Sequence, residues 1–361
     1  MTRPPLSPRD GSRTDPSRLR KVLLIRLRRI GDIILTTPAV RALRTALPRA
    51  ELVYVVEEPY RKLVEGNPDI DRVIAVPKRQ SRREFLALVR AIRKEGYDAV
   101  IDFHGGPRAS LLALLSGAKV KAGYAIKYRG LFYDVRVPRA PKLGRIHSVE
   151  NHVNLVRALG IEVREISGLV LPRGQVSTFD FPNTESQKLR PAPFIVLHIG
   201  AGNRFRYWGT DNLVRLVRLL GEIKGTRVAL IGGAEDKAAE AEILEKAPGT
   251  LSYVGKLDLA GTAELIRQAA IFVGPDSGPM HIAAAVGTPI VAWFGPTLPA
   301  NFAPWKPAGG VRIIEKALDC RPCKQRTCVH GDFRCLQLIT PEEVRGQVSI
   351  FNFLPDQKLE N

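Results

Sequence analysis

The stretch FVGPDSGPMHIAAAVGTPIVAWFGP, residues 272–296, contains the signals of a strand, a turn, a helix and a second strand. It opens on aromatic and β-branched residues that suit a short buried strand, and the glycines and prolines that follow, residues 274–278, predict a turn. Pro279 fits the first position of a helix, where a missing N–H costs nothing, and Gly287 ends that helix. The apolar run at 289–294 predicts the next buried strand. The stretch therefore predicts one repeat of an α/β sheet.

A glycine-containing turn between a strand and a helix can hold an anion. Its free backbone N–H groups and the positive end of the helix dipole point at whatever lies above the sheet, so phosphate is the expected guest. The alternative is an ordinary strand–turn–helix with a packing glycine, which a bare Gly-x-x-x-Gly pattern favours. Polar side chains at the mouth of the turn favour a ligand instead. The candidate binding residues are Asp276, Ser277, Gly278, Pro279, Met280 and His281.

Composition and charge narrow the classes of protein that fit. A chain of 361 residues with 45% hydrophobic residues suits two soluble domains. No apolar run approaches the ~20 residues of a membrane-spanning helix. The basic residues 1–20 lack the apolar segment of a secretory signal, so we expect a disordered tail there and a cytoplasmic location.

The net charge is +19, and residues 1–160 hold 32 Lys and Arg against 15 Asp and Glu. Nucleic acid, an anionic membrane and a phosphorylated substrate all fit this basic half.

Strand and helix patterns alternate along the chain, which predicts parallel, doubly wound sheets with ligands at the carboxyl ends of their strands. The expected strands are residues 21–26, 52–56, 73–76, 99–103, 194–198, 227–231, 251–254, 271–273 and 289–294. The expected helices are residues 38–47, 85–94, 108–115, 148–159, 211–220 with Thr210 as N-cap, 235–246, 259–269 and 279–286. Loss of periodicity marks a linker, so we expect a tail at 1–20, a domain at 21–165, a linker at 166–193 and a second domain at 194–361.

Several separated motifs, in this order, resemble glycosyltransferase family 9, the lipopolysaccharide heptosyltransferases. They are residues 28–39 with their Gly-Asp pair, 101–110, 198–208, 231–236 and the Asp-Ser-Gly-Pro-Met-His turn. The resemblance covers most of the chain between residues 21 and 345. It implies a GT-B fold, in which two Rossmann-like domains face a central cleft. It also implies an inverting enzyme that transfers heptose from ADP-L-glycero-D-manno-heptose to the lipopolysaccharide inner core.

Asp32 is the candidate general base, because sugar transfer to a hydroxyl requires a group that takes its proton. We expect this aspartate in the loop that follows the first strand. From spacing alone, a role in capping the next turn or in pairing with Arg28 or Arg29 is favoured, and the resemblance favours the base instead. Under the resemblance the first domain holds the acceptor. The candidate acceptor-binding residues are Arg28, Arg29, Gly31, His104, Gly105 and Arg108.

The second domain supplies the candidate donor site. Gly200 and Gly202 would let backbone approach a diphosphate closely, and Arg206 would neutralise it. The family usually has Lys-x-Trp-Pro where this chain has Arg-Tyr-Trp-Gly, which leaves the donor sugar open. Glu235 and Asp236 would accept ribose hydroxyls, or would serve only as acids in the first turn of a helix. The candidate donor-binding residues outside the turn are Gly200, Ala201, Gly202, Arg206, Gly232, Gly233, Glu235 and Asp236.

All four cysteines fall within a loop at residues 320–335. Clustered thiols in a cytoplasmic chain suggest a structural zinc site, with an iron–sulfur cluster and unligated thiols as alternatives. Similar cysteines occur in the family that the chain resembles, and no catalytic role follows from them. The candidate ligands are Cys320, Cys323, Cys328 and Cys335, with His330 in reserve. Arg206 and the helix N-terminus would replace a metal at the diphosphate, so no cofactor is expected for catalysis.

The expected partners are an ADP-sugar donor and an anionic, lipid-linked oligosaccharide acceptor at the inner face of the inner membrane. The basic residues 78–83 and 119–145 would attract such an acceptor, although a charge run is usually only a solvated face. One rival function is that of a GT-B epimerase or hydrolase, and another is transfer from a different nucleotide sugar. A nucleic-acid-binding protein is a rival of another class, but the chain lacks an aromatic-interleaved basic motif.

Overall fold

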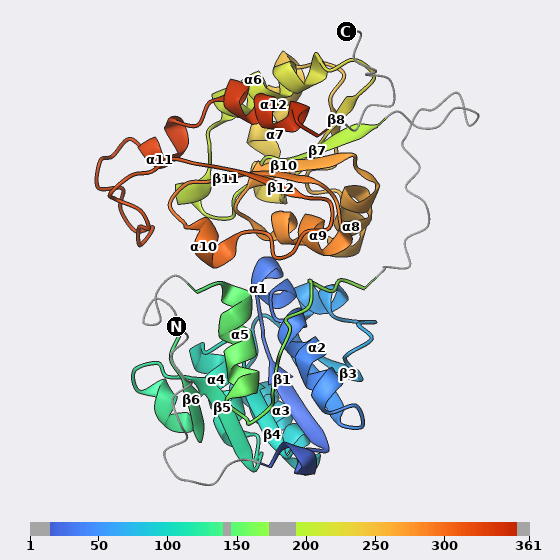
Figure 1. Ribbon diagram of the computed structural model, residues 1–361, viewed down its shortest axis with the longest axis vertical. Coiled ribbons are helices and arrows are strands. Elements are labelled where there is room, and N and C mark those ends of the chain that lie inside the picture. Colours follow the sequence, from blue (N-terminus) through green and yellow to red (C-terminus); the bar gives the residue numbers. More distant parts are fainter. Residues whose placement is uncertain (1–14, 140–145, 173–192, 352–361) are drawn as a thin grey trace, which may run out of the picture. The chain divides into compact units, whose positions relative to one another are not determined.

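The computed structural model describes residues 15–139, 146–172 and 193–351, and the chain divides into two compact units, 1–172 and 173–361. Each unit, taken by itself, is a parallel sheet with helices packed on its faces (Figure 1), which confirms the expected α/β class. Most of the expected tail at 1–20 and of the expected linker at 166–193 lies outside the described residues.

The described part of the first unit contains one sheet of six parallel strands. Their spatial order is β3 (Arg72–Val76), β2 (Glu51–Glu57), β1 (Lys21–Ile25), β4 (Ala99–Asp102), β5 (Val120–Tyr124) and β6 (Val135–Val137). The chain builds outward from β1 in both directions, and such a switch point opens a crevice at the carboxyl ends of the strands. The register pairs Ile25 with Asp102, so the residues that follow β1 and β4 emerge side by side.

Helices of the first unit cover both faces of this sheet. They are α1 (Ile30–Ile34), α2 (Thr37–Ala46), α3 (Arg82–Lys94), α4 (Pro107–Leu115) and α5 (Ser148–Arg157), with single 3-10 turns η1 (Pro16–Arg18), η2 (Glu58–Leu63) and η3 (Arg129–Phe132). α2 packs against α5, whereas α4 packs against α3 and η3. One apolar cluster joins α3 and α4 to the sheet through residues such as Val89, Leu112 and Val100.

The described part of the second unit also contains six parallel strands. Their order is β12 (Val311–Glu315), β11 (Ile290–Phe294), β10 (Ile271–Pro275), β7 (Phe194–His198), β8 (Arg227–Ile231) and β9 (Leu251–Ser252). The helices are α6 (Thr210–Gly221), α7 (Lys237–Lys246), α8 (Leu259–Gln268), α9 (Gly278–Val286), α10 (Pro299–Phe302), α11 (Arg334–Gln337) and α12 (Pro341–Ser349), with 3-10 turns η4 (Arg204–Arg206) and η5 (Ala234–Asp236). Trp208 and Trp293 lie with ring centroids 4.6 Å apart in the core.

Some sequence-based boundaries were wrong. Asp32 lies in the first turn of α1 and not in a loop. Thr210 is the first helical residue of α6 rather than its N-cap, because Gly209 occupies the cap position with a φ of 97° that favours glycine. β10 continues to Pro275, so the turn begins later than expected. The sequence reasoning missed three strands, β5, β6 and β12, and four helices, α1, α10, α11 and α12.

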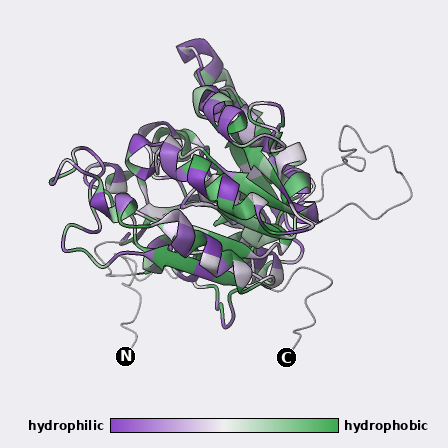
Figure 2. Cartoon of the chain, turned by 90° about the horizontal axis from the view of Figure 1, so that it is seen from above, coloured by the Kyte–Doolittle hydropathy of each residue, from purple (hydrophilic) through white to green (hydrophobic). Residues whose placement is uncertain are grey.

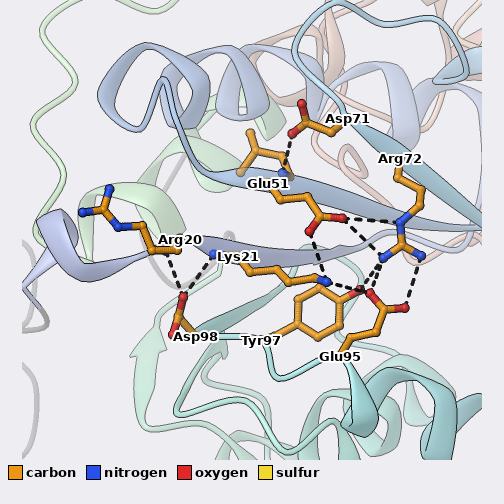
Figure 3. Close-up of polar contacts among 9 residues, drawn as sticks. Arg20, Lys21, Glu51, Asp71, Arg72, Glu95, Tyr97 and Asp98 are labelled. Carbon is orange, nitrogen blue, oxygen red and sulfur yellow. Dashed lines mark hydrogen bonds and ion pairs between the residues drawn. The ribbon is translucent and has the colours of Figure 1, made fainter.

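The strands consist mostly of hydrophobic residues, whereas hydrophilic residues are frequent on the helices (Figure 2). At the amino ends of β1, β2 and β3, charged side chains and the nearby Glu95, which follows α3, neutralise one another (Figure 3). Lys21 pairs with Glu51 at 3.1 Å and with Glu95 at 2.9 Å, and Arg72 pairs with the same two carboxylates. This edge of the first unit is therefore balanced in charge. No helix in the described part of the chain is long and apolar enough to span a bilayer.

Candidate active site

The residue after β1 and the first turn of α1 bring a cation and a carboxylate together. The Nη2 atom of Arg26 lies 2.7 Å from the Oδ2 atom of Asp32. The side chain of Arg26 is 4% exposed and that of Asp32 is 34% exposed. Arg26 also donates from Nη1 to the Phe103 carbonyl at 2.6 Å and from Nε to the Arg28 carbonyl at 3.0 Å. Three partners thus hold the Arg26 guanidinium in place. The guanidinium in turn holds one oxygen of the Asp32 carboxylate, and this carboxylate is still accessible to solvent.

Of the two structural alternatives for Asp32, the structure shows the capping contact but not the ion pair with Arg28 or Arg29. Its Oδ2 atom accepts the backbone N–H of Arg29 at 3.5 Å, as an acid in the first turn of a helix can. Its guanidinium partner, however, is Arg26 and not the exposed Arg28 or Arg29 that the sequence suggested. Burial is the largest influence and acts to raise the pKa of the Asp32 carboxyl. The charge of Arg26, together with His152 and the hydrogen bonds from Arg26 and Arg29, holds that pKa below its usual range. Asp32 is therefore an ionised proton acceptor at neutral pH.

The loop after β4 is fixed by a buried aspartate. Asp102 accepts the backbone N–H groups of His104 at 2.8 Å and Gly105 at 2.9 Å, and the Tyr133 hydroxyl at 2.6 Å. Gly105 has a φ of 68°, which explains the glycine. Burial, assisted by the charge of Arg26, lowers the pKa of His104 to about 4, so its imidazole is neutral. Its Nδ1 atom is buried without a hydrogen-bond partner among the described residues. His104 can therefore accept or donate a hydrogen bond at this edge.

The remaining candidate acceptor residues differ in whether a ligand could reach them. Arg28 and Arg29 are exposed beside the pair, and Gly31 is buried in α1. Arg108 is already engaged, because its guanidinium donates to the Pro77 carbonyl at 2.8 Å and to Gln80 at 2.7 Å. As the structure describes it, Arg108 holds the segment before α3 in place.

Sequence reasoning missed Arg26 and His152. A charged residue at the end of an otherwise apolar strand was the available signal for Arg26. His152 sits on the buried face of α5, with Nδ1 2.7 Å from the Tyr124 hydroxyl and the ring edge-on to Phe103. Burial depresses the pKa of His152 well below its ordinary value, with Arg26 adding to the effect. No sequence signal distinguishes it from a histidine of the core.

In the second unit, Arg206 and Asp276 form an ion pair. The Nη1 atom of Arg206 lies 3.2 Å from Asp276 Oδ2 and donates to the Asp276 carbonyl, also at 3.2 Å. Thr297 donates its hydroxyl to the same carboxylate at 2.6 Å. The Nε atom of Arg206 donates to Gln325, a residue of the cysteine-containing loop, at 3.1 Å. The predicted phosphate-binding cation thus lies beside the turn before α9.

The turn is shorter than the sequence predicted, because β10 runs to Pro275 and α9 begins at Gly278. Pro279 lies in the first turn of α9, and Gly287 ends the helix at a φ of 85°. The Ser277 hydroxyl is 3.0 Å from His198 Nδ1, and burial lowers the pKa of His198 to about 4. Met280 is fully buried and His281 nearly so. Met280 therefore belongs to the core, whereas the N-terminus of α9 at Gly278 remains a place for an anion.

Two of the glycines around β7 and β8 lie against the side chain of Asp236. A Cβ atom on Gly200 would lie 2.1 Å from Asp236 Oδ2, and one on Gly232 would lie 2.8 Å from the same atom. Gly233 donates its N–H to that carboxylate at 2.8 Å. Burial raises the pKa of Asp236, and the adjacent Glu235 adds to the rise. Gly200 and Gly232 therefore leave room for the Asp236 side chain, whereas a Cβ atom on Gly233 would meet Glu235.

A cavity of about 480 Å³ lies in the second unit, where η4, η5, α6 and α7 meet. Four candidate donor residues line it, and the sequence reasoning missed the rest of its wall. The lining residues are Ala201, Gly202, Asn203, Arg204, Tyr207, Thr210, Glu235, Asp236, Ala238, Ala239 and Glu242. The candidate donor residues thus gather at two places, this cavity and the turn before α9, joined by the loop of residues 200–206.

The cysteine-containing loop of residues 320–335 shows no metal-binding group of side chains in its described part. Cys335 is buried and the other three thiols are half-buried, while His330 is exposed. Burial raises the pKa of Cys335 to about 11, so this thiol is protonated. No group of three or more metal-ligating side chains comes together within the described ranges. The structural zinc site stays a prediction, which metal analysis of the purified protein tests.

Comparisons with known proteins agree on one family. The profile of glycosyltransferase family 9 (heptosyltransferase) matches residues 85–333. Lipopolysaccharide heptosyltransferase 3 of Escherichia coli is 24% identical over 293 residues, which cover 76% of this chain and 83% of the relative. A family 9 glycosyltransferase structure from Veillonella parvula has a TM-score of 0.77 at 22% identity and covers 94% of this chain and 99% of that chain. The structure of E. coli ADP-heptose lipopolysaccharide heptosyltransferase II gives 0.73 at 23% identity, with coverage of 92% and 98%. These likenesses show the GT-B fold.

Proposed function

The chain belongs to glycosyltransferase family 9, and from that premise we propose that it transfers heptose from ADP-L-glycero-D-manno-heptose to the inner core of lipopolysaccharide. The observation that carries the proposal is the Asp32 carboxylate, kept ionised by Arg26 at a carboxyl edge of the sheet. A glycosyltransferase requires such a group at the acceptor hydroxyl. Two relatives named above carry heptosyltransferase names, which supports heptose as the sugar.

In the proposed reaction, the acceptor oxygen attacks C1 of heptose on the face opposite the diphosphate. Asp32 takes the hydroxyl proton, a new C1–O bond forms, and the bond between C1 and the phosphate oxygen breaks with its electron pair leaving on ADP. The configuration at C1 is inverted. The Arg206 guanidinium and the N-terminus of α9 stabilise the negative charge on the departing diphosphate, so the proposal contains no catalytic metal.

The second unit is the proposed donor-binding part. Glu235 and Asp236 line the cavity and provide acceptors for sugar and ribose hydroxyls. Arg206 then takes the phosphates, because it lies beside the turn before α9. The altered Arg-Tyr-Trp-Gly motif keeps another nucleotide sugar as the alternative donor.

The first unit is the proposed acceptor-binding part. Its exposed Arg28 and Arg29 and its neutral His104 surround Asp32, which suits a phosphorylated saccharide. We place the reaction at the cytoplasmic face of the inner membrane, where a lipid-linked acceptor would be held. Nucleic acid is not part of this proposal.

The test is transfer by the purified chain, followed by mass analysis of the product. Replacing Asp32 by Asn should leave ADP-heptose binding intact and reduce turnover by at least about a hundredfold, the scale of losing a general base. Glu162→Gln is the matched control, because Glu162 is an exposed carboxylate of the same unit, with its side chain 72% exposed. Near-normal turnover of the Asp32→Asn variant would remove Asp32 from the mechanism. Transfer from UDP- or GDP-sugars, with none from ADP-heptose, would select the alternative donor.

A further inference from the structure

Helix α4 is unusual for a helix at the surface. Its sequence, PRASLLALL, is apolar on almost every side, and a helix of that kind normally lies buried. Leu112 and Ala113 do pack into the core of the first unit. Leu111 and Leu114, however, are 39% and 37% exposed on the outer face. Two leucines three residues apart share one side of a helix, so they form a continuous apolar strip.

The neighbouring turn η3 extends this strip. η3 packs against α4 and carries Leu131, which is 67% exposed. Tyr128 directly before η3 is 72% exposed, and it holds a φ of 65° that a non-glycine residue rarely adopts. These are the two most exposed large apolar side chains in the described part of the first unit. We call Leu111, Leu114, Tyr128 and Leu131 the α4–η3 surface.

Basic side chains border the α4–η3 surface. On one side, Arg108 in the first turn of α4 bonds to the Pro77 carbonyl and to Gln80, which places the following basic segment next to α4. On the other side, the Lys127 ammonium lies 5.0 Å from the ring centroid of Tyr128. The exposed basic residues of this border are Lys78, Arg79, Arg82, Arg83 and Lys127.

The surface also adjoins the candidate acceptor residues. Arg129, the first residue of η3, donates from Nε to the Gly105 carbonyl at 3.1 Å. Gly105 follows His104, whose pKa responds to the charges of Arg26 and Asp32. A molecule held on the α4–η3 surface would therefore lie close to the edge of the sheet at which we place the acceptor.

We propose that the α4–η3 surface docks the protein on an anionic phospholipid bilayer, an inference that rests on the proposed function for the identity of the acceptor. Exposed Leu and Tyr side chains would enter the region between headgroups and acyl chains. The basic border would bind the anionic headgroups, and the two contributions together give reversible binding that neither gives alone. A nucleic-acid surface needs the cations but not the apolar centre. A second copy of this chain would bring the same positive border into repulsive contact.

Vesicle sedimentation tests the inference with the full chain and without turnover. Binding to vesicles of phosphatidylcholine with phosphatidylglycerol should be clear, and binding to phosphatidylcholine alone should be weak. The Tyr128→Ser/Leu131→Ser variant should bind the mixed vesicles at least about tenfold more weakly, because it withdraws two apolar side chains from the bilayer. Replacing Lys78, Arg79, Arg82 and Arg83 by Gln should weaken binding comparably.

Matched controls lie on the second unit. Leu338→Ser/Ile350→Ser removes two apolar side chains that are 51% and 49% exposed, and Lys224→Gln removes an exposed cation. Neither control should change vesicle binding. Equal binding by the Tyr128→Ser/Leu131→Ser variant and its control would overturn the inference. So would equal binding to neutral and anionic vesicles, displacement of vesicles by RNA, or loss of a wild-type dimer in the same variant.

Activity separates this inference from the proposed function. With a membrane-embedded acceptor, the Tyr128→Ser/Leu131→Ser variant should lose transfer, and with a delipidated, water-soluble acceptor it should match the wild type. Equal loss with both acceptors would show a role in catalysis rather than in docking. If the wild type transfers no sugar at all, the proposed function fails, whereas the vesicle measurement still decides the docking surface.

Discussion

At the scale of the residue, the decisive contact is between Arg26 and Asp32. A buried guanidinium is costly unless its charge and donors are satisfied, and here it has one carboxylate and two carbonyls. Arg can serve all three because its donors are spread over a planar fork, whereas Lys offers a single point of charge. The carboxylate is consequently held both in position and in its ionised form.

Replacing Arg26 by Gln should therefore change the pH dependence of transfer. In the wild type, activity falls only as the pH drops through a carboxyl pKa that lies below its ordinary value of about 4. Without Arg26, burial dominates, and the acidic limb should move to higher pH by roughly one to three units. The measurement is kcat/KM against pH, with folding checked by thermal unfolding.

Arg26→Lys serves as the control for charge. It should give a smaller displacement of the acidic limb, because the cation is kept while the second and third hydrogen bonds are lost. An acidic limb that stays in place in Arg26→Gln, with turnover merely reduced, would show that Arg26 supports the fold and does not set the ionisation of Asp32.

At the scale of the element, the sequence predicted the strands that are apolar throughout and the helices with clear caps. The unit from β10 to β11 emerged nearly as expected, because Pro279 and Gly287 mark both ends of α9. β12 was missed because only one of its five residues, Ile314, is buried, so it lacks the apolar run of the central strands. β6 was missed because it has three residues. Local sequence preference alone does not specify either strand. Each becomes a strand because it pairs with its neighbour in the sheet.

The site residues also divide into those that a local motif indicates and those whose contacts form only when distant segments pack together. Asp32 and Arg206 were proposed because each lies in a local motif of the family that the chain resembles. The function of Gly200 as a space for Asp236 depends on two loops that meet only after β7 and β8 pair. The bond between Arg206 and Gln325 joins positions far apart in the chain, and no periodicity could predict it.

That bond couples the cysteine-containing loop to the candidate phosphate site. The Gln325 amide oxygen accepts from Arg206 Nε at 3.1 Å and from Asn203 Nδ2 at 2.8 Å. Gln325→Ala should free both groups and raise KM for the ADP-sugar by roughly three- to tenfold, the scale of one or two net hydrogen bonds, with kcat less affected. Lys324→Ala, at the exposed neighbouring position, is the control. Equal donor KM values in the two variants would mean that Arg206 does not need this loop.

At the scale of the whole molecule, the net charge differs between the two halves of the chain, and within the first unit it differs between the two edges of the sheet. Residues 1–160 carry 32 Lys and Arg against 15 Asp and Glu, whereas the remainder is close to neutral. At the amino edge of the first sheet, Lys21 and Arg72 are neutralised by Glu51 and Glu95 (Figure 3). The exposed cations at 78–83 and at Arg28 and Arg29 lie instead toward the carboxyl edge, where the candidate acceptor residues are. Long-range attraction should therefore act on the acceptor more than on the donor.

Salt should change the apparent affinity for the acceptor more than the apparent affinity for the donor. The Debye length falls from ~30 Å at 0.01 M to ~8 Å at 0.15 M ionic strength, so attraction by exposed cations is largely screened across that range. Apparent affinity for an anionic acceptor should drop steeply, whereas the ADP-sugar, held by short contacts in the nearly neutral second unit, should change less. Replacing Lys78, Arg79, Arg82 and Arg83 by Gln should flatten the dependence for the acceptor and leave that for the donor unaltered. The measurement is both Michaelis constants against salt, with a water-soluble acceptor so that vesicle binding does not contribute. Equal salt slopes for donor and acceptor would show that the basic half attracts something other than the acceptor, and nucleic acid would then be the next ligand to test.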